Sequence, residues 1–486
     1  MYGDTKAQVH WPVAPMNNCT DILMWSSIMT AEQIASLQPA LCALIQRFRP
    51  HFNRQSTFNY FRCYLLGLMA DLKRKSIEPI ALAAGTAVRS LQEFLAFFVW
   101  DHQRVNDELQ RMVANQHGGA DARGGIGVLD ASAHAKCGDK TPGVQRQYCG
   151  ETGKLDNCVV GQHLLYTDND ANNPFCCVLA SDLFLPQCWD EDRERCQAAH
   201  IPDDVKHRTK WRIGLDQVKQ AIGNGVRFAW LTFDEDYGKV PVFWFGLDEL
   251  GQRGIGEVPR NFRCWTKPPK YRSLRTEFAA SEIQHLYRHS PAFTGQAWRK
   301  MKIKDSTRGP VVWEVKHAQV HLVDTSHKDS RGSHATDRTY WLIVARNVRT
   351  REMKYFVSNA PASVPLEQLM AVAFARWHIE QWFQRAKQEC GFGAFEVRTY
   401  KSLMRHWLCS RLVMYFLAAQ TQRLRGENPR ITLEQIAEVA NTLAEKIWHN
   451  CRRSWSQLIR RCAYHQSRNE ASYASRRRGR EESDSS

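Results

Sequence analysis

GVLDASAHAK, residues 127–136, is the stretch at which the periodicity of the chain changes from helical to strand-like. Its apolar residues come in a short run that ends in an aspartate, which is typical of a buried β-strand. Two similar runs follow, NCVVGQHLLYTD (157–168) and PFCCVLASDLFLP (174–186), joined by a turn-rich segment. These three runs predict the beginning of a β-sheet.

Helices and strands alternate after these runs. IGLDQVKQAIGNG (213–225) and PVFWFGLDELGQ (241–252) have helical spacing, whereas VRFAWLTFD (226–234) and GIGEVP (254–259) are strand-like. Three strands followed by a helix, a strand, a helix and a strand predict a mixed α/β sheet.

The part before residue 117 has helical periodicity throughout. AEQIASLQPALCALIQRF (31–48), TFNYFRCYLLGLMADLKRK (57–75) and one long segment from Gly85 to Asn115 carry apolar residues at helical spacing. We therefore expect an all-α N-terminal domain at 1–116, followed by the glycine-rich linker 117–127.

The part after residue 260 begins with a basic, tryptophan-rich stretch that includes WTKPPKYR (265–272) and WRKMKIKD (298–305). Strands resume at TYWLIVARNV (339–348), and helical patterns follow to the C-terminal side. The remaining domains that we expect are an α/β core in two parts (128–260 and 339–425), a β-rich inserted subdomain (261–338), a helical C-terminal region (426–470) and a charged, disordered tail (471–486).

Composition limits the partners of the protein. The chain has 486 residues, and Lys and Arg exceed Asp and Glu by 66 − 50 = 16. Such an excess of positive charge favours a polyanionic partner, with nucleic acid as the first candidate and an anionic membrane surface as the second. The start of the chain lacks a signal-peptide-like apolar core, and no run approaches the roughly 18 apolar residues of a membrane span, so we expect a soluble intracellular protein. The 15 cysteines include no C-x-x-C pair and favour buried thiols over a zinc site.

Acidic residues end two of the strand-like runs. Asp130 ends GVLD and Asp234 ends RFAWLTFD, positions that correspond to the rim of an α/β sheet. Either residue alone could instead be a helix cap or a turn residue.

RWHIEQWFQRAK, residues 376–387, adds a third carboxylate. On a helix Arg376, Glu380 and Lys387 fall at about 0°, 40° and 20°, so they form one narrow stripe beside the buried face. An ordinary Arg–Glu pair on a solvated edge is the alternative.

Three carboxylates from separate elements repel one another unless divalent cations hold them. Hard oxygen ligands suit Mg²⁺, with Mn²⁺ as a substitute. Two such ions could support an in-line phosphoryl displacement, and Arg376 and Lys387 could then hold phosphates beside the reacting bond.

The same residues lie in blocks that resemble the DDE transposases of bacterial insertion sequences. The blocks are GVLDASAHAK with GVQRQYCGETGKLDNCVVGQHL, then FDEDYG with GLDELG and GEVP, then RWHIEQWFQRAKQECGFGAFEVR. The resemblance implies a ribonuclease H-like catalytic core in which Asp130, Asp234 and Glu380 bind metal. The third block of the family is often Y-x₂-R-x₃-E-x₆-K, and Ala373 stands here in place of the tyrosine.

What the resemblance implies about function is a transposase that cleaves DNA at element ends and joins the 3′-hydroxyls to target DNA. By analogy we expect a cut-and-paste route, a helical N-terminal domain (1–116) that binds the terminal inverted repeats, and a homodimer on DNA. Its double-stranded partners would be these repeats and the target DNA, and its location would be bacterial, cytoplasmic and nucleoid-associated. The alternatives are a catalytically inactive, transposase-derived DNA-binding protein, and a general DNA nuclease or resolvase on the same fold.

Further DNA contacts are candidates in two places. Arg146, Gln147, Tyr148 and Lys154 belong either to an ordinary hairpin or to a site of phosphate and base contact. In the predicted insertion, the aromatic residues among Lys and Arg could stack on bases or form a small core; they are Trp298, Trp265, Tyr271 and Trp313.

Other acidic residues and one histidine compete for the predicted site. Asp236 is the alternative to Asp234, and Asp182 is mid-strand without an obvious partner. Glu389 is expected to be solvated, because it lies about 180° from Glu380 around the helix. Glu396 is expected beyond the helix end, and His134 could be a polar neighbour of Asp130 or a metal ligand.

Overall fold

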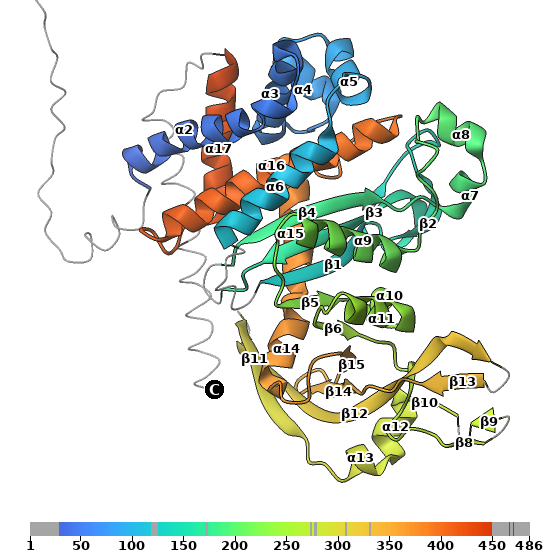
Figure 1. The fold of residues 1–486 in the computed structure, drawn as a ribbon. Helices are drawn as coiled ribbons and strands as arrows, with labels where there is room; N and C mark the ends of the chain where they lie inside the picture. The colour runs from blue at the N-terminus through green and yellow to red at the C-terminus, as the bar shows by residue number, and fades with distance from the viewer. Residues whose placement is uncertain are drawn as a thin grey trace, which may run out of the picture.

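The computed structural model describes residues 29–449 apart from 118–124, 171–173, 273–274, 277–278, 307–308 and 330–331, together with residues 466 and 470. The helices of the N- and C-terminal parts lie together at one end of the molecule, and the strands occupy the middle and the other end (Figure 1). The predicted tail 471–486 and most of the predicted linker fall outside the described residues.

The described part before residue 118 is helical, as predicted. It contains α2 (Ala31–Arg47), the 3₁₀ turn η1 (Arg49–His51), α3 (Gln55–Met69), α4 (Ile77–Ala83), α5 (Val88–Ala96) and α6 (His102–His117). The helix α2 begins with a capping box, in which the Thr30 hydroxyl accepts from the Gln33 N–H and the Gln33 side chain accepts from the Thr30 N–H.

The single helical segment predicted from Gly85 to Asn115 is wrong, because two helices, α5 and α6, occupy this range. The Asp101 carboxylate accepts hydrogen bonds from the backbone N–H groups of Gln103 (2.9 Å) and Arg104 (3.3 Å). A side chain that binds these N–H groups starts a new helix, which periodicity alone does not reveal.

The central sheet begins at residue 126. Its first strands are β1 (Ile126–Ala135), β2 (Gln145–Cys149), β3 (Lys154–Thr167), β4 (Cys176–Leu183), β5 (Trp230–Phe233) and β6 (Gly254–Glu257). The helices between them are α7 (Gln187–Asp190), α8 (Arg193–Ala198), α9 (Lys210–Gly223), α10 (Glu235–Gly238) and α11 (Pro241–Glu249). β1 pairs antiparallel with β3 and parallel with β5, and β5 pairs parallel with β6. The mixed α/β sheet is therefore as predicted.

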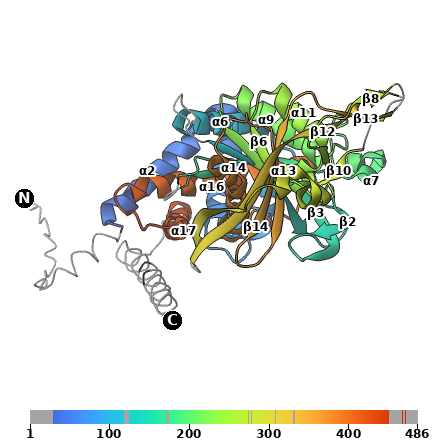
Figure 2. The ribbon, with the colours of Figure 1, turned by 90° about the horizontal axis from the view of Figure 1, so that it is seen from below.

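Most strands of residues 261–358 extend the same sheet. These residues form β7 (Arg263–Trp265), β8 (Tyr271–Arg272), β9 (Arg275–Thr276), β10 (Ser281–Glu282), α12 (Ile283–His289), α13 (Pro291–Thr294), β11 (Arg299–Ser306), β12 (Gly309–Asp329), β13 (Gly332–Ala335), β14 (Tyr340–Asn347) and β15 (Met353–Ser358). β8 and β9 form a separate two-stranded sheet. Among the described residues thirteen strands make one sheet, whose main path is β10-β7-β12-β14-β15-β6-β5-β1-β3-β2. Figure 2 shows this β12–β14 end from below, with the N-terminal helices behind it. The stretch predicted as an inserted subdomain thus contributes strands that are continuous with the central sheet.

Helices cover both faces of the sheet around β1. Successive side chains of a strand point to opposite faces. Leu129 points toward α9, because a Cβ atom added at Gly214 of that helix would lie 3.2 Å from the Leu129 side chain. Asp130 points to the other face and contacts Arg376. Arg376 joins α14 (Leu366–Ala375) to α15 (Trp377–Cys390). The helices α9 and α15 therefore lie on opposite sides of β1.

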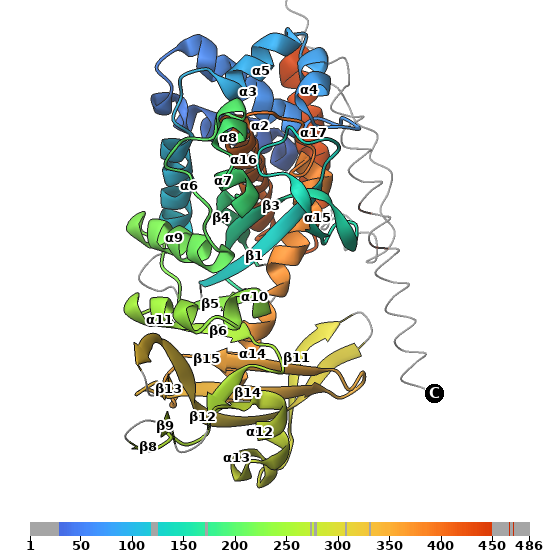
Figure 3. The same cartoon turned by 90° about the vertical axis from the view of Figure 1, so that its right-hand side faces the viewer.

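The helix α16 (Tyr400–Arg425) connects the N-terminal helices to the sheet. Every residue from 402 to 418 is buried, and the helix contacts α3, α5, α6, β4 and also α17 (Leu433–His449). Figure 3 shows α16 between the upper helices and the strands below. A helix that is buried all round needs such neighbours on every side. None of the described helices is both long and apolar enough to span a membrane.

Buried Arg405 attaches the centre of α16 to the N-terminal helices. Its guanidinium donates to four carbonyl groups, those of Phe94 (3.1 Å), Leu95 (2.9 Å), Phe98 (3.0 Å) and Trp100 (2.7 Å). The side chain is 2% exposed. Two of these carbonyls belong to the last turn of α5 and two to the segment after it, so one cation donates to carbonyl groups that a helix end leaves without partners inside the helix.

We predict that Arg405→Ala lowers the free energy of unfolding by at least about 3 kcal/mol, because several buried carbonyls lose their donor. Arg423→Ala, on an exposed part of the same helix, is the control and should change it by less than about 0.5 kcal/mol. Urea denaturation of both variants measures the difference. Equal effects would show that the carbonyl contacts of Arg405 do not stabilise the fold.

Candidate active site

Asp130 and Asp234 are neighbours because of the register between β1 and β5. The last residue pair of this parallel ladder is Leu129 with Phe233, so each aspartate is the next residue on its own chain. GVLDASAHAK forms a strand, as predicted, but Asp130 lies within this strand and not at its end, since β1 continues to Ala135. It is β5 that ends there, and β1 continues along β3, where Asp130 pairs with His163.

Asp234 both caps a helix and faces the site. Its side chain accepts from the Asp236 N–H (3.0 Å) at the start of the short helix α10. Asp236, the alternative second carboxylate, accepts from Lys210 (3.1 Å) and Lys239 (2.6 Å) instead. These ammonium groups outweigh the effect of burial and lower the pKa of Asp236. Asp236 is thus engaged by lysines, which leaves Asp234 as the carboxylate beside Asp130.

Arg376 brings the third carboxylate to this pair. Its guanidinium donates to the Asp130 carboxylate at 3.1 Å and to the Glu380 carboxylate at 2.5 Å. The side chains of Asp130 and Arg376 are 13% and 24% exposed, whereas that of Glu380 is 48% exposed. The Arg376–Glu380 pair expected on a solvated edge is therefore present, but the same guanidinium also binds Asp130 of the sheet.

The pKa shifts show how unfavourable this concentration of acid groups is. Burial, and then the charge of Asp234, raise the pKa of Asp130 to about 7, although Arg376 acts in the opposite direction. Burial and the charge of Asp236 likewise raise the pKa of Asp234. Burial would lower the pKa of Arg376, but the charges of Asp130, Glu380 and Asp234 raise it. Arg376 is the cation that offsets the repulsion between these carboxylates.

Glu257 is a further acidic residue at the same sheet edge. It follows Gly256, which pairs with Phe233 in the parallel β5–β6 ladder, so Glu257 is level with Asp234. Its charge acts on Arg376, and both of its oxygens accept from Lys354 (2.8 and 2.9 Å). Glu257 was not predicted as a site residue, although GIGE carries the same signal as RFAWLTFD, an acidic residue that ends an apolar strand.

Lys387 links α15 to the β2–β3 hairpin. Its ammonium lies 3.3 Å from the Glu151 carboxylate in the hairpin turn, and the other Glu151 oxygen accepts from the Ala135 N–H (2.8 Å). Among the hairpin candidates, Arg146 and Lys154 are exposed and the Tyr148 side chain is 65% exposed.

Gln147 differs from the other hairpin candidates. Its side chain donates to the Cys158 carbonyl and accepts from Gln145, so it is used within the hairpin. The hairpin thus presents two cations and an aromatic ring beside α15.

The aromatic candidates in 261–338 pack inside the protein where the structure describes them. Trp265 and Trp313 are buried. Trp298 is partly buried, with the Arg346 guanidinium 4.3 Å and the Lys316 ammonium 5.2 Å from its ring centre. These contacts favour the core interpretation over base stacking, and the side chain of Tyr271 lies outside the described residues.

Three expectations about neighbouring groups need correction or refinement. The prediction that Glu389 is solvated is wrong: the residue is half-buried, and burial raises its pKa although the charge of Lys75 acts in the opposite direction. Asp182 has a partner after all, the Gln217 side-chain amide at 2.9 Å. His134 is fully buried between the rings of Phe392, Phe395 and Trp407, so it belongs to the core.

The donor set fits a hard divalent cation. Carboxylate oxygens that repel one another at a sheet edge are the ligands that Mg²⁺ and Mn²⁺ prefer. As the side chains stand, no three His, Cys, Asp or Glu residues of the described part are arranged to hold a metal. Arg376 lies between Asp130 and Glu380 and supplies the positive charge that a metal would otherwise provide.

The chain is similar in sequence to an endonuclease family and to a transposase. The sequence profile described as DDE superfamily endonuclease matches residues 47–310, which include Asp130 and Asp234 and end before Glu380. A probable transposase for insertion sequence element IS701 from Microchaete diplosiphon is 29% identical over 364 residues, which are 74% of this chain and 82% of that protein. A solved structure of a piggyBac transposase synaptic complex with hairpin DNA aligns with a TM-score of 0.36 and 10% identity, over 91% of this chain and 84% of that chain.

We predict that Arg376→Ala destabilises the protein by about 1–3 kcal/mol in metal-free buffer, because Asp130 and Asp234 lose their compensating charge. The matched control is Arg385→Ala on the same helix, where an exposed ion pair with Glu434 should contribute less than about 0.5 kcal/mol. Chemical denaturation in EDTA measures both. If the two variants lose the same stability, Arg376 does not hold the carboxylates together.

Proposed function

The chain belongs to the DDE superfamily endonucleases, and from this membership we propose that it is the DNA transposase of an insertion sequence. It cleaves phosphodiester bonds at the ends of the element and joins the released 3′-hydroxyl groups to target DNA. The relative from Microchaete diplosiphon, a probable transposase matched over most of both chains, supports this assignment.

The observation that carries the proposal is the cluster of Asp130, Asp234 and Glu380 around Arg376. We assign β1 to β6 with α9 to a ribonuclease H-like core. In support, β1 to β4 pair antiparallel with their neighbours, while β5 and β6 run parallel to β1. The carboxylates then lie at the edge where the parallel strands end, which is the usual location of α/β sites.

Asp130, Asp234 and Glu380 would hold Mg²⁺, or Mn²⁺ as a substitute. When bound, such ions supply Lewis-acid stabilisation of a phosphoryl displacement. In this proposal the carboxylates exchange Arg376 for metal, and the guanidinium then becomes free to contact a phosphate. The protein needs neither a histidine base nor a covalent nucleophile for this reaction.

Lys387 and the β2–β3 hairpin would position the DNA. Exposed Arg146, Tyr148 and Lys154 lie on the hairpin whose Glu151 contacts Lys387. Exposed cations beside an aromatic ring suit both phosphate and base contacts. We keep Gln147 and Trp298 as weaker members of this set, because their side chains are engaged within the protein.

The substrate would be double-stranded DNA, comprising the terminal inverted repeats of the element and the target. The excess of 16 positive charges supports a DNA partner. A homodimer on DNA and a cut-and-paste route are the remaining parts of the proposal, and they rest on the resemblance of the third block, RWHIEQWFQRAK, to the family.

We predict that Asp130→Asn, Asp234→Asn and Glu380→Gln each abolish cleavage while leaving DNA binding nearly intact, because these residues hold metal rather than DNA. Glu235→Gln, at an exposed acidic residue next to Asp234, should leave cleavage unchanged. A nicking assay with Mg²⁺ and DNA that flanks the gene measures this.

Each outcome of this assay has a definite consequence. A variant that retains more than a few per cent of wild-type cleavage removes its residue from the site. Wild-type protein that binds this DNA but never cuts it would instead be a catalytically inactive DNA-binding protein. Cleavage without strand transfer would identify a general nuclease.

Binding to duplex DNA should weaken steeply with salt. Counterion release gives a slope of about −0.9 in log K against log salt for each neutralised phosphate. Fluorescence anisotropy over a salt series, with Ca²⁺ to prevent cleavage, measures the slope. An affinity that does not change with salt would mean that the excess of positive charge does not contribute to DNA binding.

A further inference from the structure

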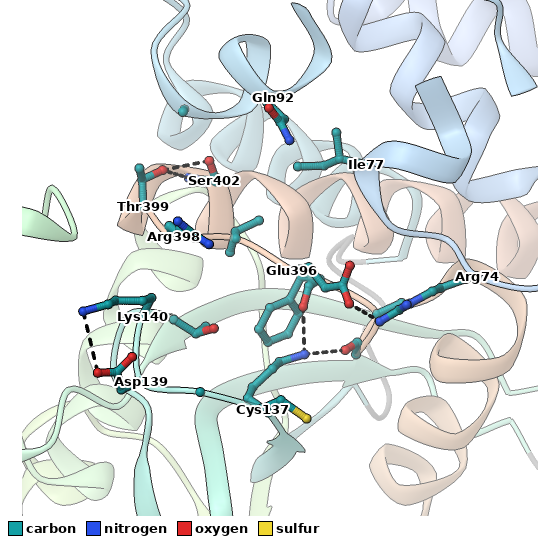
Figure 4. Close-up of a pocket in the computed structure, with 18 of the residues that line it drawn as sticks. Arg74, Ile77, Gln92, Cys137, Asp139, Lys140, Glu396, Arg398, Thr399 and Ser402 are labelled. Carbon is teal, nitrogen blue, oxygen red and sulfur yellow. Dashed lines mark hydrogen bonds and ion pairs between the residues drawn. The ribbon is translucent and has the colours of Figure 1, made fainter. Parts of the chain in front are cut away.

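A cleft of about 900 Å³ separates the N-terminal helices from the core. One wall is the exposed face of α5, and the other comprises the end of β1 with the loop 136–141 and the loop 393–399 before α16. Figure 4 shows Arg398 in the middle of this cleft and Arg74 at one side. Its volume lies in the range of ligand-binding clefts, roughly 300–1,000 Å³.

The charges that line the cleft leave a positive excess. Each of its three carboxylates is paired with a lining cation: Glu93 with Arg89, Glu396 with Arg74, and Asp139 with Lys140. Two further cations, Lys136 and Arg398, remain after these pairs. Arg398 is exposed, and its side chain makes no hydrogen bond or ion pair with any residue that the structure describes.

Lys136 fixes one positive charge in the wall of the cleft. Its ammonium donates to the carbonyls of Gly393 (2.9 Å) and Phe395 (2.8 Å) and lies 3.6 Å from the centre of the Phe395 ring. All of these partners are neutral, so the charge itself is not cancelled by an ion pair there. The α16 N-terminus, whose residues Thr399 and Ser402 also line the cleft, adds the positive end of a helix dipole.

The cleft is aligned with the carboxylate site. β1 leads from Asp130 to Lys136, which is six residues or about 20 Å along an extended strand. α15 leads from Arg376, beside Asp130, to the loop at 393–399. Between the two ends, Lys387 is tied through Glu151 to the Ala135 N–H. Arg376, Lys387, Lys136 and Arg398 therefore follow one another along α15, the end of β1 and the loop 393–399, from the carboxylates to the cleft. Arg376 and Lys387 are ion-paired, whereas Lys136 and Arg398 form no ion pair with the described residues.

We propose that this cleft binds the phosphodiester backbone of the same DNA that enters the carboxylate site, about six base pairs from the cleaved bond. The estimate follows from the distance of about 20 Å and the rise of 3.4 Å per base pair. The inference rests on the proposed function, since it needs DNA at the carboxylates. It adds a second contact region, built from the N-terminal helices and the core together.

Two substitutions that change the charge of the cleft in opposite directions test the proposal. The affinity for a fluorescein-labelled duplex of mixed sequence is measured by fluorescence anisotropy in Ca²⁺. Arg398→Ala should weaken binding about five- to tenfold and make the salt slope shallower by about 0.9, the loss of one phosphate contact. Glu396→Gln releases Arg74 and should tighten binding about two- to threefold. A gain in affinity cannot result from misfolding.

Matched controls come from the exposed turn between β14 and β15, where Arg349→Ala and Glu352→Gln make the same changes of charge away from the cleft. Both should leave the affinity and the slope unchanged. If wild type binds and cleaves DNA but Arg398→Ala and Glu396→Gln behave like their controls, the cleft proposal is overturned while the proposed function stands. If wild type binds no duplex, the proposed function itself fails.

A second arm locates the contact on the DNA. Neutral methylphosphonate linkages, placed one at a time along the flanking duplex that wild type cleaves, should weaken wild-type binding about six base pairs from the cleaved bond. Arg398→Ala should lose this particular sensitivity and keep the others. Sensitivity that stays the same in Arg398→Ala would contradict the proposal.

Discussion

The parallel pairing of β1 with β5 is the constraint on which the rest of the site depends. Its last pair, Leu129 with Phe233, places Asp130 and Asp234 side by side where β5 ends. Glycines make this packing possible: a Cβ at Gly127 would come within 2.3 Å of Leu231, and one at Gly256 within 2.0 Å of the Phe233 ring. A shift in this register would separate the two carboxylates, because alternate residues face opposite sides.

Arg376 connects this sheet edge to the helices. It stands between α14 and α15, and its two ion pairs join Asp130 of the sheet to Glu380 of the helix. The same helix pair leads to the loop 393–399 and to α16, whose buried Arg405 attaches the N-terminal helices. The proposed active site and the cleft beside α5 thus belong to one connected set of elements. Arg376 binds carboxylate oxygens in this set, and buried Arg405 binds carbonyl oxygens.

The local sequence predicted individual helices and strands better than it predicted which of them contact one another. Strand-like runs that end in acidic residues and a helical stripe of Arg376, Glu380 and Lys387 were sufficient to suggest one site. The bridge from Arg376 to Asp130 joins residues 246 positions apart, and the continuation of the sheet through 261–358 depends on β12 pairing with β14. Periodicity cannot specify such long-range pairs. The half-buried Glu389 was missed for the same reason, since the end of its helix contacts Lys75, 314 positions away. The break between α5 and α6 was missed for another reason: it depends on the local cap at Asp101, which helical periodicity does not reveal.

The most direct test of the central claim is a crystal structure of the protein with Mn²⁺, read from the anomalous difference map. The account predicts a peak bonded to the carboxylate oxygens of Asp130 and Asp234, with Arg376 turned away from Asp130. A map in which Mn²⁺ is absent from these carboxylates at saturating concentration, or is held elsewhere while Arg376 keeps its contact with Asp130, would contradict it.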